Sequence, residues 1–154
     1  MRLTEFLDFE AIKPALPGGS KRALLQQLAQ LAAQRTGQDG AAILASLVER
    51  EKLGSTGFGQ GVAIPHGKVE GLTGIYCLFA RLGEPIEYRA IDGAPVDLVF
   101  LLLSPPDAGA DHLKALAAIS RVTRHARTLD KMRGARSRDA LAAVLMGADE
   151  RDAA

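Results

Sequence analysis

The sequence predicts an α/β fold, a single-domain sandwich in which a mixed β-sheet has helices on both faces. Two segments with helical periodicity come first, several short segments rich in branched and aromatic residues follow, and two more helical segments come last. The chain has 154 residues, of which 47% are hydrophobic, so it has the size of one domain and can bury a core. This order of elements is typical of a sheet covered on each side.

Each of the first two helices is expected to begin after a capping side chain and to end at a glycine. Ser20 and Gly37 bracket the first helix, and Asp39 and Gly54 bracket the second. The apolar positions with a 3.6-residue period are Leu24, Leu25, Leu28, Leu31 and Ala32 in the first helix, and Ile43, Leu44, Leu47 and Val48 in the second.

Three segments with Gly or Pro at their boundaries are predicted to be strands, at residues 62–64, 75–80 and 96–103. Residues 98–103 (LVFLLL) are apolar at every position, which is typical of a central strand covered on both faces. Ser104 and the two prolines after it end this strand.

Two further helices are predicted after the last strand. Asp111 is placed to cap the first of them, and the second begins near Ser137. Their apolar faces carry Leu113, Leu116, Ala117, Ile119 and Ser120, and then Leu141, Val144 and Leu145. We expect residues 1–147 to form the domain and the small, polar residues 148–154 to form a flexible tail.

The composition excludes several classes of protein. Nineteen Lys and Arg against eighteen Asp and Glu give a net charge of +1, which excludes a globally basic nucleic-acid binder. The longest apolar run is too short to span a bilayer, and the first ten residues contain no signal-peptide pattern. The single cysteine, Cys77, excludes an internal disulfide and suits a reducing compartment. We therefore expect a cytoplasmic protein without membrane insertion or a nucleic-acid partner.

Glycine is concentrated in one region, since seven of the sixteen glycines lie between Gly54 and Gly74. Residues 53–68 read LGSTGFGQGVAIPHGK and superficially look like a phosphate-binding loop. A Walker loop needs Gly-Lys-Ser/Thr before a helix, and a dinucleotide fingerprint needs glycine where Val62 stands, so we exclude both. The segment is interpreted as a loop and strand that present an accessible His66, with backbone groups near enough to fix its tautomer. A loop histidine without a role is the alternative.

Four other side chains are candidates for the same site as His66. His112 lies in the first turn of a helix, where free N–H groups suit an anion, although a role in capping alone is equally consistent. Arg50, at the end of the second helix, is either a forked phosphate clamp or part of a solvated charged face. Ser55 and Thr56 either donate hydroxyl hydrogen bonds to the anion or are turn residues.

The histidines give no sign of a metal site. His66, His112 and His125 form no HExxH motif and no close His/Cys pair, so we expect no zinc. His125 falls on the side of a continuing helix away from His112, and we expect it at the surface.

Two features are candidate interaction surfaces. Phe58, between two glycines, is either core or exposed to meet a partner, and we expect it to contact a partner protein beside the site. The stretch 121–138 contains seven Lys or Arg and one acid, and it favours a solvated face over an acidic protein partner, with nucleic acid third. If one helix continues through it, the cations that cluster are Arg121, Arg124, Arg127 and Lys131.

Residues 49–68 (EREKLGSTGFGQGVAIPHGK) and 109–121 (GADHLKALAAISR) resemble two characteristic segments of the enzyme IIA domains of the bacterial phosphotransferase system, in the fructose/mannitol superfamily. Over its whole length the chain is most similar to the nitrogen-regulatory branch. The resemblance implies a mixed sheet with helices on both sides. It also implies that His66 carries a phosphoryl group on Nε2, that His112 assists the transfer and that Arg50 lines the site.

The resemblance further implies a partner and a function. The phosphoryl donor would be a small histidine-phosphorylated carrier of the HPr type, from the nitrogen branch, and the domain itself would bind no cofactor. The chain would be a regulatory phosphocarrier that binds target proteins according to its phosphorylation state. Two alternatives remain open: a sugar-transport enzyme IIA that passes phosphate to a IIB partner, and a module that binds an anion without a covalent step.

Overall fold

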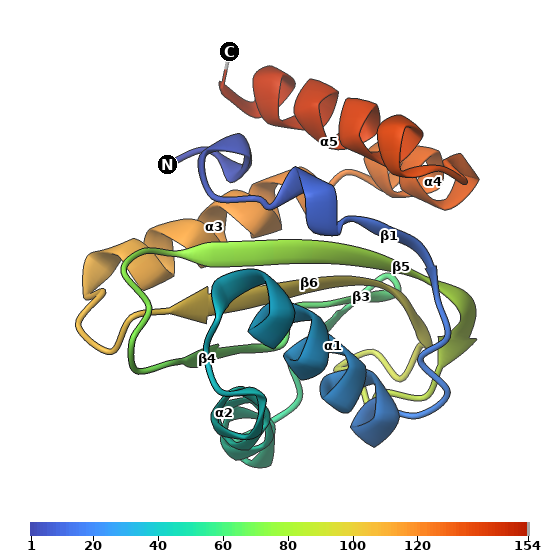
Figure 1. Ribbon diagram of the computed structural model, residues 1–154. Helices are drawn as coiled ribbons and strands as arrows, with labels where there is room; N and C mark the ends of the chain where they lie inside the picture. The colour runs from blue at the N-terminus through green and yellow to red at the C-terminus, as the bar shows by residue number, and fades with distance from the viewer. Residues whose placement is uncertain (154) are drawn as a thin grey trace.

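The computed structural model describes the backbone of residues 1–153 and the side chains of residues 1–151. It has one mixed β-sheet with helices on both faces, which confirms the predicted fold class (Figure 1). Two 3₁₀ helices span Leu3–Glu5 and Phe9–Ala11, and the strands are β1 (Lys13–Leu16), β2 (Gly57–Gly59), β3 (Val62–Ala63), β4 (His66–Lys68), β5 (Tyr76–Ile86) and β6 (Val96–Ser104). The α-helices are α1 (Lys21–Thr36), α2 (Gly40–Lys52), α3 (Ala110–Thr123), α4 (Ala126–Gly134) and α5 (Arg138–Ala153).

The sheet has the order β1–β5–β6–β3–β2, and β4 also pairs with β6. Strand β6 is antiparallel to β5 and parallel to both β3 and β4. Strand β3 lies beside the first half of β6, with Val62 opposite Leu98, and β4 lies beside its end, with His66 opposite Leu102. The chain from β3 to β4 therefore runs along β6 and brings His66 to the end of the central strand.

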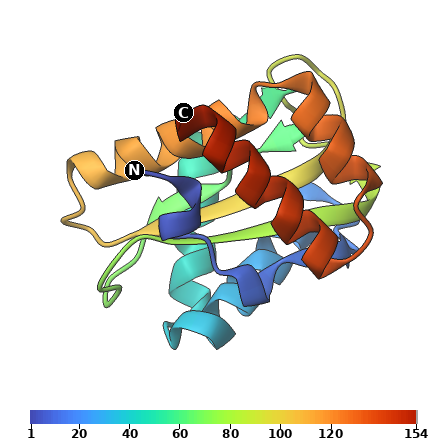
Figure 2. The same cartoon turned by 90° about the horizontal axis from the view of Figure 1, so that it is seen from above.

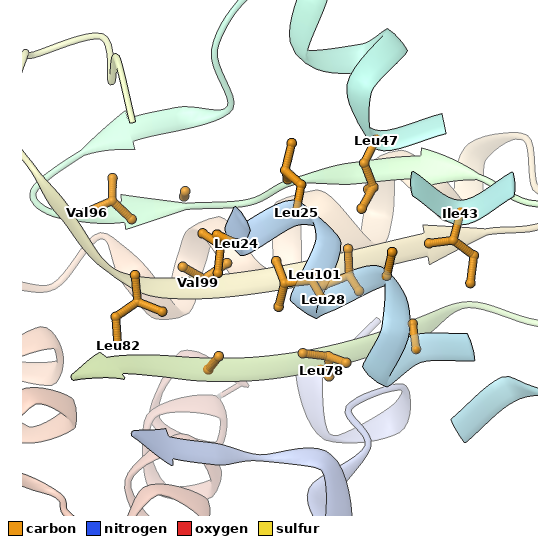
Figure 3. Close-up of a cluster of buried hydrophobic side chains, with 14 of the residues drawn as sticks. Leu24, Leu25, Leu28, Ile43, Leu47, Leu78, Leu82, Val96, Val99 and Leu101 are labelled. Atoms are coloured by element: carbon orange, nitrogen blue, oxygen red, sulfur yellow. The ribbon is translucent and has the colours of Figure 1, made fainter. Parts of the chain in front are cut away.

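Each face of the sheet carries its own hydrophobic core. Helices α1 and α2 cover one face, where Leu24, Leu28 and Ile43 pack against the sheet (Figure 3). Helices α3, α4 and α5 cover the other. Residues 98–103 of β6 are all completely buried, and they alternate between the two cores. This confirms the prediction of a central strand covered on both sides.

The predicted helix boundaries at Ser20, Gly37 and Asp39 are also confirmed. The Ser20 hydroxyl accepts a hydrogen bond from the Ala23 N–H at 3.1 Å, and the Asp39 carboxylate accepts one from the Ala41 N–H at 3.0 Å. Gly37 has a φ of 76°, the left-handed conformation that commonly ends helices at glycine.

The start of α3 differs from the prediction. Gly109 is the N-terminal cap residue, and Asp111 lies within the first helical turn. Asp111 makes no capping hydrogen bond, so the prediction that it caps α3 was wrong; the φ of 58° at Gly109 makes the turn into the helix. His112 nevertheless lies in the first turn.

The basic stretch is not one continuous helix. Helix α3 ends at Thr123 and α4 begins at Ala126, so Arg121 and Arg127 lie on different helices. The condition for a helical cluster of the four cations is therefore not met. His125, at the junction, is exposed, as expected.

The structure has a helix where a flexible tail was expected after residue 147. Helix α5 continues to Ala153, and the buried Asp149 carboxylate accepts hydrogen bonds from the Leu3 N–H at 3.0 Å and the Thr4 N–H at 3.2 Å. These bonds hold the N-terminal segment beside α5 (Figure 2). Ala148 and Asp149 are therefore buried as part of α5, and residue 154 lies outside the described residues. No helix among the described residues is long and apolar enough to cross a bilayer.

Candidate active site

His66 lies in β4 with its two ring nitrogens in different environments. Nδ1 is 2.7 Å from the carbonyl oxygen of Ile64. Because a carbonyl oxygen only accepts, Nδ1 carries the proton and Nε2 keeps its lone pair. Nε2 in turn accepts a hydrogen bond from Nε of Arg50 at 3.1 Å. The backbone therefore fixes the tautomer, as predicted.

The ring of His66 is less accessible than expected, since the residue is only 8% exposed. Burial lowers the pKa of His66 below its ordinary value of 6.5, and the positive charge of Arg50 lowers it further. The Ile64 carbonyl and the Glu51 carboxylate oppose this shift of the pKa. The imidazole is therefore neutral at neutral pH, which is the nucleophilic form.

Arg50 is held in the last turn of α2 by the loop that follows it. Its Nη1 donates to the carbonyl oxygen of Gly54 at 2.8 Å while its Nε donates to His66. Gly54 has a φ of 142°, so this turn favours glycine. The predicted meeting of Arg50 and His66 is present, and the guanidinium lies against the lone pair of Nε2.

His112 approaches His66 from the start of α3. The two ring centroids are 5.4 Å apart and the rings are tilted by 55°. Burial lowers the pKa of His112, and the nearby His66 and Lys68 lower it further. Both rings are therefore neutral at neutral pH, and two histidines that are far apart in the sequence share one site.

Sequence reasoning missed Ser104, the last residue of β6. Its side chain is completely buried, and its hydroxyl lies 2.5 Å from Nδ1 of His112. We interpreted Ser104 only as the end of the strand, because nothing in the local sequence indicates that a serine will meet a histidine eight residues later. The hydroxyl fixes the orientation of the His112 ring.

A pocket of about 470 Å³ surrounds these groups. Arg50, His66 and His112 line it together with Leu53 and Leu113, which are 85% and 69% exposed. The two leucines, which sequence reasoning also missed, form an apolar rim around a polar centre. A partner that covers the rim would exclude water from the histidines.

The hydroxyls of Ser55 and Thr56 do not line this pocket. Thr56 is completely buried, and its hydroxyl bonds to the Glu51 carboxylate and lies 3.0 Å from the Tyr88 hydroxyl. Ser55 donates to the carbonyl oxygen of Tyr88 at 3.3 Å. The prediction that the two hydroxyls hold a phosphate is corrected accordingly, because both are committed to fixing the loop.

Phe58 lies in β2 and is 50% exposed, which agrees with the exposed alternative. It lines a separate hollow with residues from the end of α3, among them Thr123 and Arg124. Phe58 therefore lies at the end of α3 and does not line the pocket of His66, and its contact with a partner remains a prediction. Among the described residues, no group of three or more His, Cys, Asp or Glu side chains could hold a metal ion.

Residues 5–147 match the family described as "Phosphoenolpyruvate-dependent sugar phosphotransferase system, EIIA 2". The chain belongs to this family. It is 52% identical over 145 residues to the nitrogen regulatory protein of Bradyrhizobium diazoefficiens, covering 94% of this chain and 95% of that one. It is 42% identical over 132 residues to the nitrogen regulatory protein of Pseudomonas aeruginosa, covering 85% and 86%.

Its structure is similar to the crystal structure of nitrogen regulatory protein IIA-Ntr from Neisseria meningitidis. The TM-score is 0.86 at 35% identity, and the match covers 92% of this chain and 97% of that one. The EIIA chain is thus a domain of the phosphotransferase type, with the sheet and helices that the sequence predicted.

Proposed function

We propose that this EIIA chain is a regulatory phosphocarrier of a nitrogen-type phosphotransferase system. It accepts a phosphoryl group on Nε2 of His66 from an HPr-like carrier and binds target proteins according to its phosphorylation state. The observation that carries the proposal is the neutral His66, whose Nε2 lone pair faces Arg50 while the Ile64 carbonyl holds the opposite nitrogen. The similarity to nitrogen regulatory proteins supports the choice of branch.

The transfer is a displacement between two imidazole rings. The Nε2 lone pair of His66 forms a new bond to phosphorus, and the phosphorus–nitrogen bond of the carrier's phosphohistidine breaks. The bonding electron pair returns to the carrier's ring, so no water and no redox partner takes part. His66 keeps the Nδ1 proton, and the Ile64 carbonyl stabilises the positive charge that develops on the ring.

Arg50 and His112 stabilise the transferred group rather than carry it. The Arg50 guanidinium exchanges its bond to Nε2 for bonds to phosphoryl oxygens, and the His112 ring donates from the other side. Each charge-assisted hydrogen bond contributes about 1.5–3 kcal/mol, so two such bonds influence which partner holds the phosphate. Alanine at either position should slow transfer by about 10²-fold, the usual scale for the loss of one electrostatic stabiliser.

Uptake of phosphate by the full chain tests the proposal. The protein is incubated with phosphoenolpyruvate, the general phosphotransferase enzyme and an HPr-like carrier, and its intact mass is measured. We expect one phosphate per chain, and none in a folded His66→Ala variant. Labelling of that variant at the wild-type level would refute the role of His66, and no uptake by the wild-type chain would indicate non-covalent anion binding.

A second measurement separates regulation from sugar transport. Proteins retained by the phosphorylated and unphosphorylated chains are compared, and the phosphorylated chain is mixed with purified IIB domains. We expect the two forms to retain different proteins and the phosphate to stay on the chain. Rapid passage of the phosphate to a IIB domain, with no difference in retained proteins, would favour the sugar-transport alternative.

A further inference from the structure

A second pocket lies between α4 and α5, away from the histidine pair. Its volume is about 380 Å³, and it is lined by His125, Arg127, Thr128, Lys131, Ala148 and Arg151. No residue of this pocket lines the pocket of His66. His112 lies in the first turn of α3, whereas the residues of the second pocket come after the end of α3. Figure 1 shows how α3, α4 and α5 are arranged. The 14 residues of α3 separate the two by about 20 Å.

Three cations that line this pocket have no ion-pair partner among the described side chains. Arg127 and Lys131 are four residues apart on α4 and thus lie on one face of that helix, and Arg151 comes from α5. Within the part of the chain whose side chains are described, none of the three is in an ion pair with a carboxylate. His125 also lines the pocket but has an interaction of its own, so it is not included among these three cations.

Among the described side chains, no acidic residue of these two helices lines the pocket. The negative charge of Asp130 interacts with Arg133, which is also in an ion pair with Asp97. The Asp149 carboxylate accepts a hydrogen bond from the N-terminal segment. Neither Asp130 nor Asp149 lines the pocket. The charge that faces the pocket from the described residues is therefore positive.

The N-terminus of α4 adds to this charge. Helix N-termini are usually stabilised by acidic residues or by a capping side chain, because their free N–H groups carry a partial positive charge. Helix α4 has no acidic residue in its first turn, no capping hydrogen bond from a side chain, and Arg127 at its second position. The positive charge of Arg127 beside the partial positive charge of the helix N-terminus destabilises α4 by itself. The same two charges would stabilise a bound anion.

An independent observation comes from Thr128. It lines the pocket and is only 4% exposed, yet its hydroxyl has no hydrogen-bond partner within the described residues. Buried hydroxyl groups almost always have a partner, so one without a partner requires an explanation. An anion in the pocket would accept this hydrogen bond.

We propose that the pocket between α4 and α5 binds a small phosphorylated compound. Arg127, Lys131 and Arg151 would pair with its phosphate oxygens, and Thr128 would donate a hydrogen bond to one of them. A phosphate group has close to two negative charges and three acceptor oxygens, which matches this set of donors better than a single carboxylate does. The volume lies within the range typical of small-molecule sites.

Titration of the full, unphosphorylated chain with pyrophosphate tests this proposal. Amide resonances are followed by two-dimensional NMR, because Arg50 and His112 attract anions as well and the two sites must be distinguished. We expect saturable shifts at residues 126–129 with a dissociation constant different from any seen at residues 66–68. The Arg127→Ala/Lys131→Ala variant should bind at least about tenfold more weakly, the effect of losing a charge-assisted hydrogen bond.

Three further variants test the hydroxyl and the specificity. Thr128→Val keeps the shape of the side chain and should weaken binding several-fold, whereas Thr128→Ser should retain it. Arg138→Ala removes an exposed arginine at the other end of α5, outside the pocket, and should leave binding unchanged. Thermal denaturation identifies any variant that fails to fold. If Thr128→Val does not fold, the comparison of Arg127→Ala/Lys131→Ala with Arg138→Ala and Thr128→Ser still tests the proposal.

Three results would overturn the proposal. They are shifts near α4 that do not saturate, equal weakening by Arg138→Ala, and saturable binding of a polyglutamate peptide but not of pyrophosphate. The last result would assign the pocket to an acidic protein partner instead. Uptake of phosphate on His66 is measured separately and should be normal in all these variants, so failure here leaves the proposed phosphocarrier function intact.

Discussion

In the proposed transfer, two neighbours prepare His66 for nucleophilic attack by acting on different ring nitrogens. The Ile64 carbonyl holds the proton on Nδ1, and burial together with Arg50 keeps the ring neutral. The same Arg50 that lowers the pKa also donates to Nε2, so the proposed transfer requires it to move from the nitrogen to the phosphoryl oxygens. In this resting state the proposed nucleophile, His66, and the proposed stabiliser, Arg50, are hydrogen-bonded to each other.

The lowered pKa of His66 predicts a pH dependence. Protonation removes the Nε2 lone pair, so phosphoryl acceptance should be constant at and above neutral pH and should fall only below 6.5, the ordinary pKa of histidine. Because the unfolded chain binds more protons in this range, the free energy of unfolding should also decrease as the pH falls below 6.5. NMR titration of the ring checks the assignment, and a His66 pKa at or above 6.5 would contradict it.

Ser104 acts on His112 and not on the phosphoryl group, so we predict a positioning role. Ser104→Ala should free the His112 ring and slow transfer by about tenfold, the scale of one lost hydrogen bond at about 1.4 kcal/mol. Carrier binding should be unchanged, and the ring-nitrogen resonances of His112 should shift. Ser46→Ala is the matched control, because the Ser46 hydroxyl lines the same pocket but donates to the Lys68 carbonyl at 2.9 Å. Equal effects of the two variants would contradict a specific role for Ser104.

At the scale of elements, the site depends on the close packing of α2 on β4. A Cβ atom on Gly67 would clash with Ser46, so only glycine lets α2 approach the strand that carries His66. Gly67 therefore makes room for the helix. Leu53 at the end of α2 and Leu113 at the start of α3 then come to the same rim.

Leu53 and Leu113 are predicted to dock the carrier. Serine at either position should weaken carrier binding by about tenfold or more, because exposed apolar residues around a reacting centre are well placed to be binding hot spots. Phe58→Ser should weaken it as well if the interface extends along the hollow at the end of α3. Binding is measured by calorimetry, and thermal stability should change little.

Met146→Ser is the control for this docking surface, since Met146 is 47% exposed on α5 and lines neither the pocket of His66 nor the hollow of Phe58. It should bind the carrier normally. A large loss of stability in Phe58→Ser with normal transfer per folded molecule would show that Phe58 belongs to the core.

At the scale of the whole molecule, the two ends of the chain are joined through Asp149. The Asp149→Ala variant leaves the N–H groups of Leu3 and Thr4 without their acceptor, and it should lower the free energy of unfolding by about 1–3 kcal/mol. Urea denaturation measures this change. Glu150→Ala, an exposed neighbour, should have almost no effect, and equal stability of the two variants would contradict the role of Asp149.

The layers of the fold were predictable from the sequence because periodicity, caps and glycines act locally. The apolar run 98–103 indicated the central strand, and Ser20 and Asp39 indicated two helix starts. Strand β1 was missed because it has only four residues, one of them Pro14, and its partner β5 is far along the chain. The ordered end of α5 was missed because Asp149 is held by residues at the opposite end of the sequence.

The site was predictable in part, for the same reason. His66, Arg50 and His112 were found from their positions at the ends of predicted elements, and the tautomer from the adjacent backbone. Ser104 and the leucine rim arise only when three elements converge. Ser55 and Thr56 were assigned to the anion because the sequence does not show that Glu51 and Tyr88 take up their hydrogen bonds.

The position of the phosphoryl group on the phosphorylated chain tests the central claim most directly. The chain is phosphorylated by an HPr-like carrier, the modified residue is located by tandem mass spectrometry, and the nitrogen is assigned by phosphorus and nitrogen NMR. The geometry predicts one phosphoryl group on Nε2 of His66, with Nδ1 still protonated against the Ile64 carbonyl. A phosphoryl group on Nδ1 of His66, on His112, or on no residue of the chain would contradict the account.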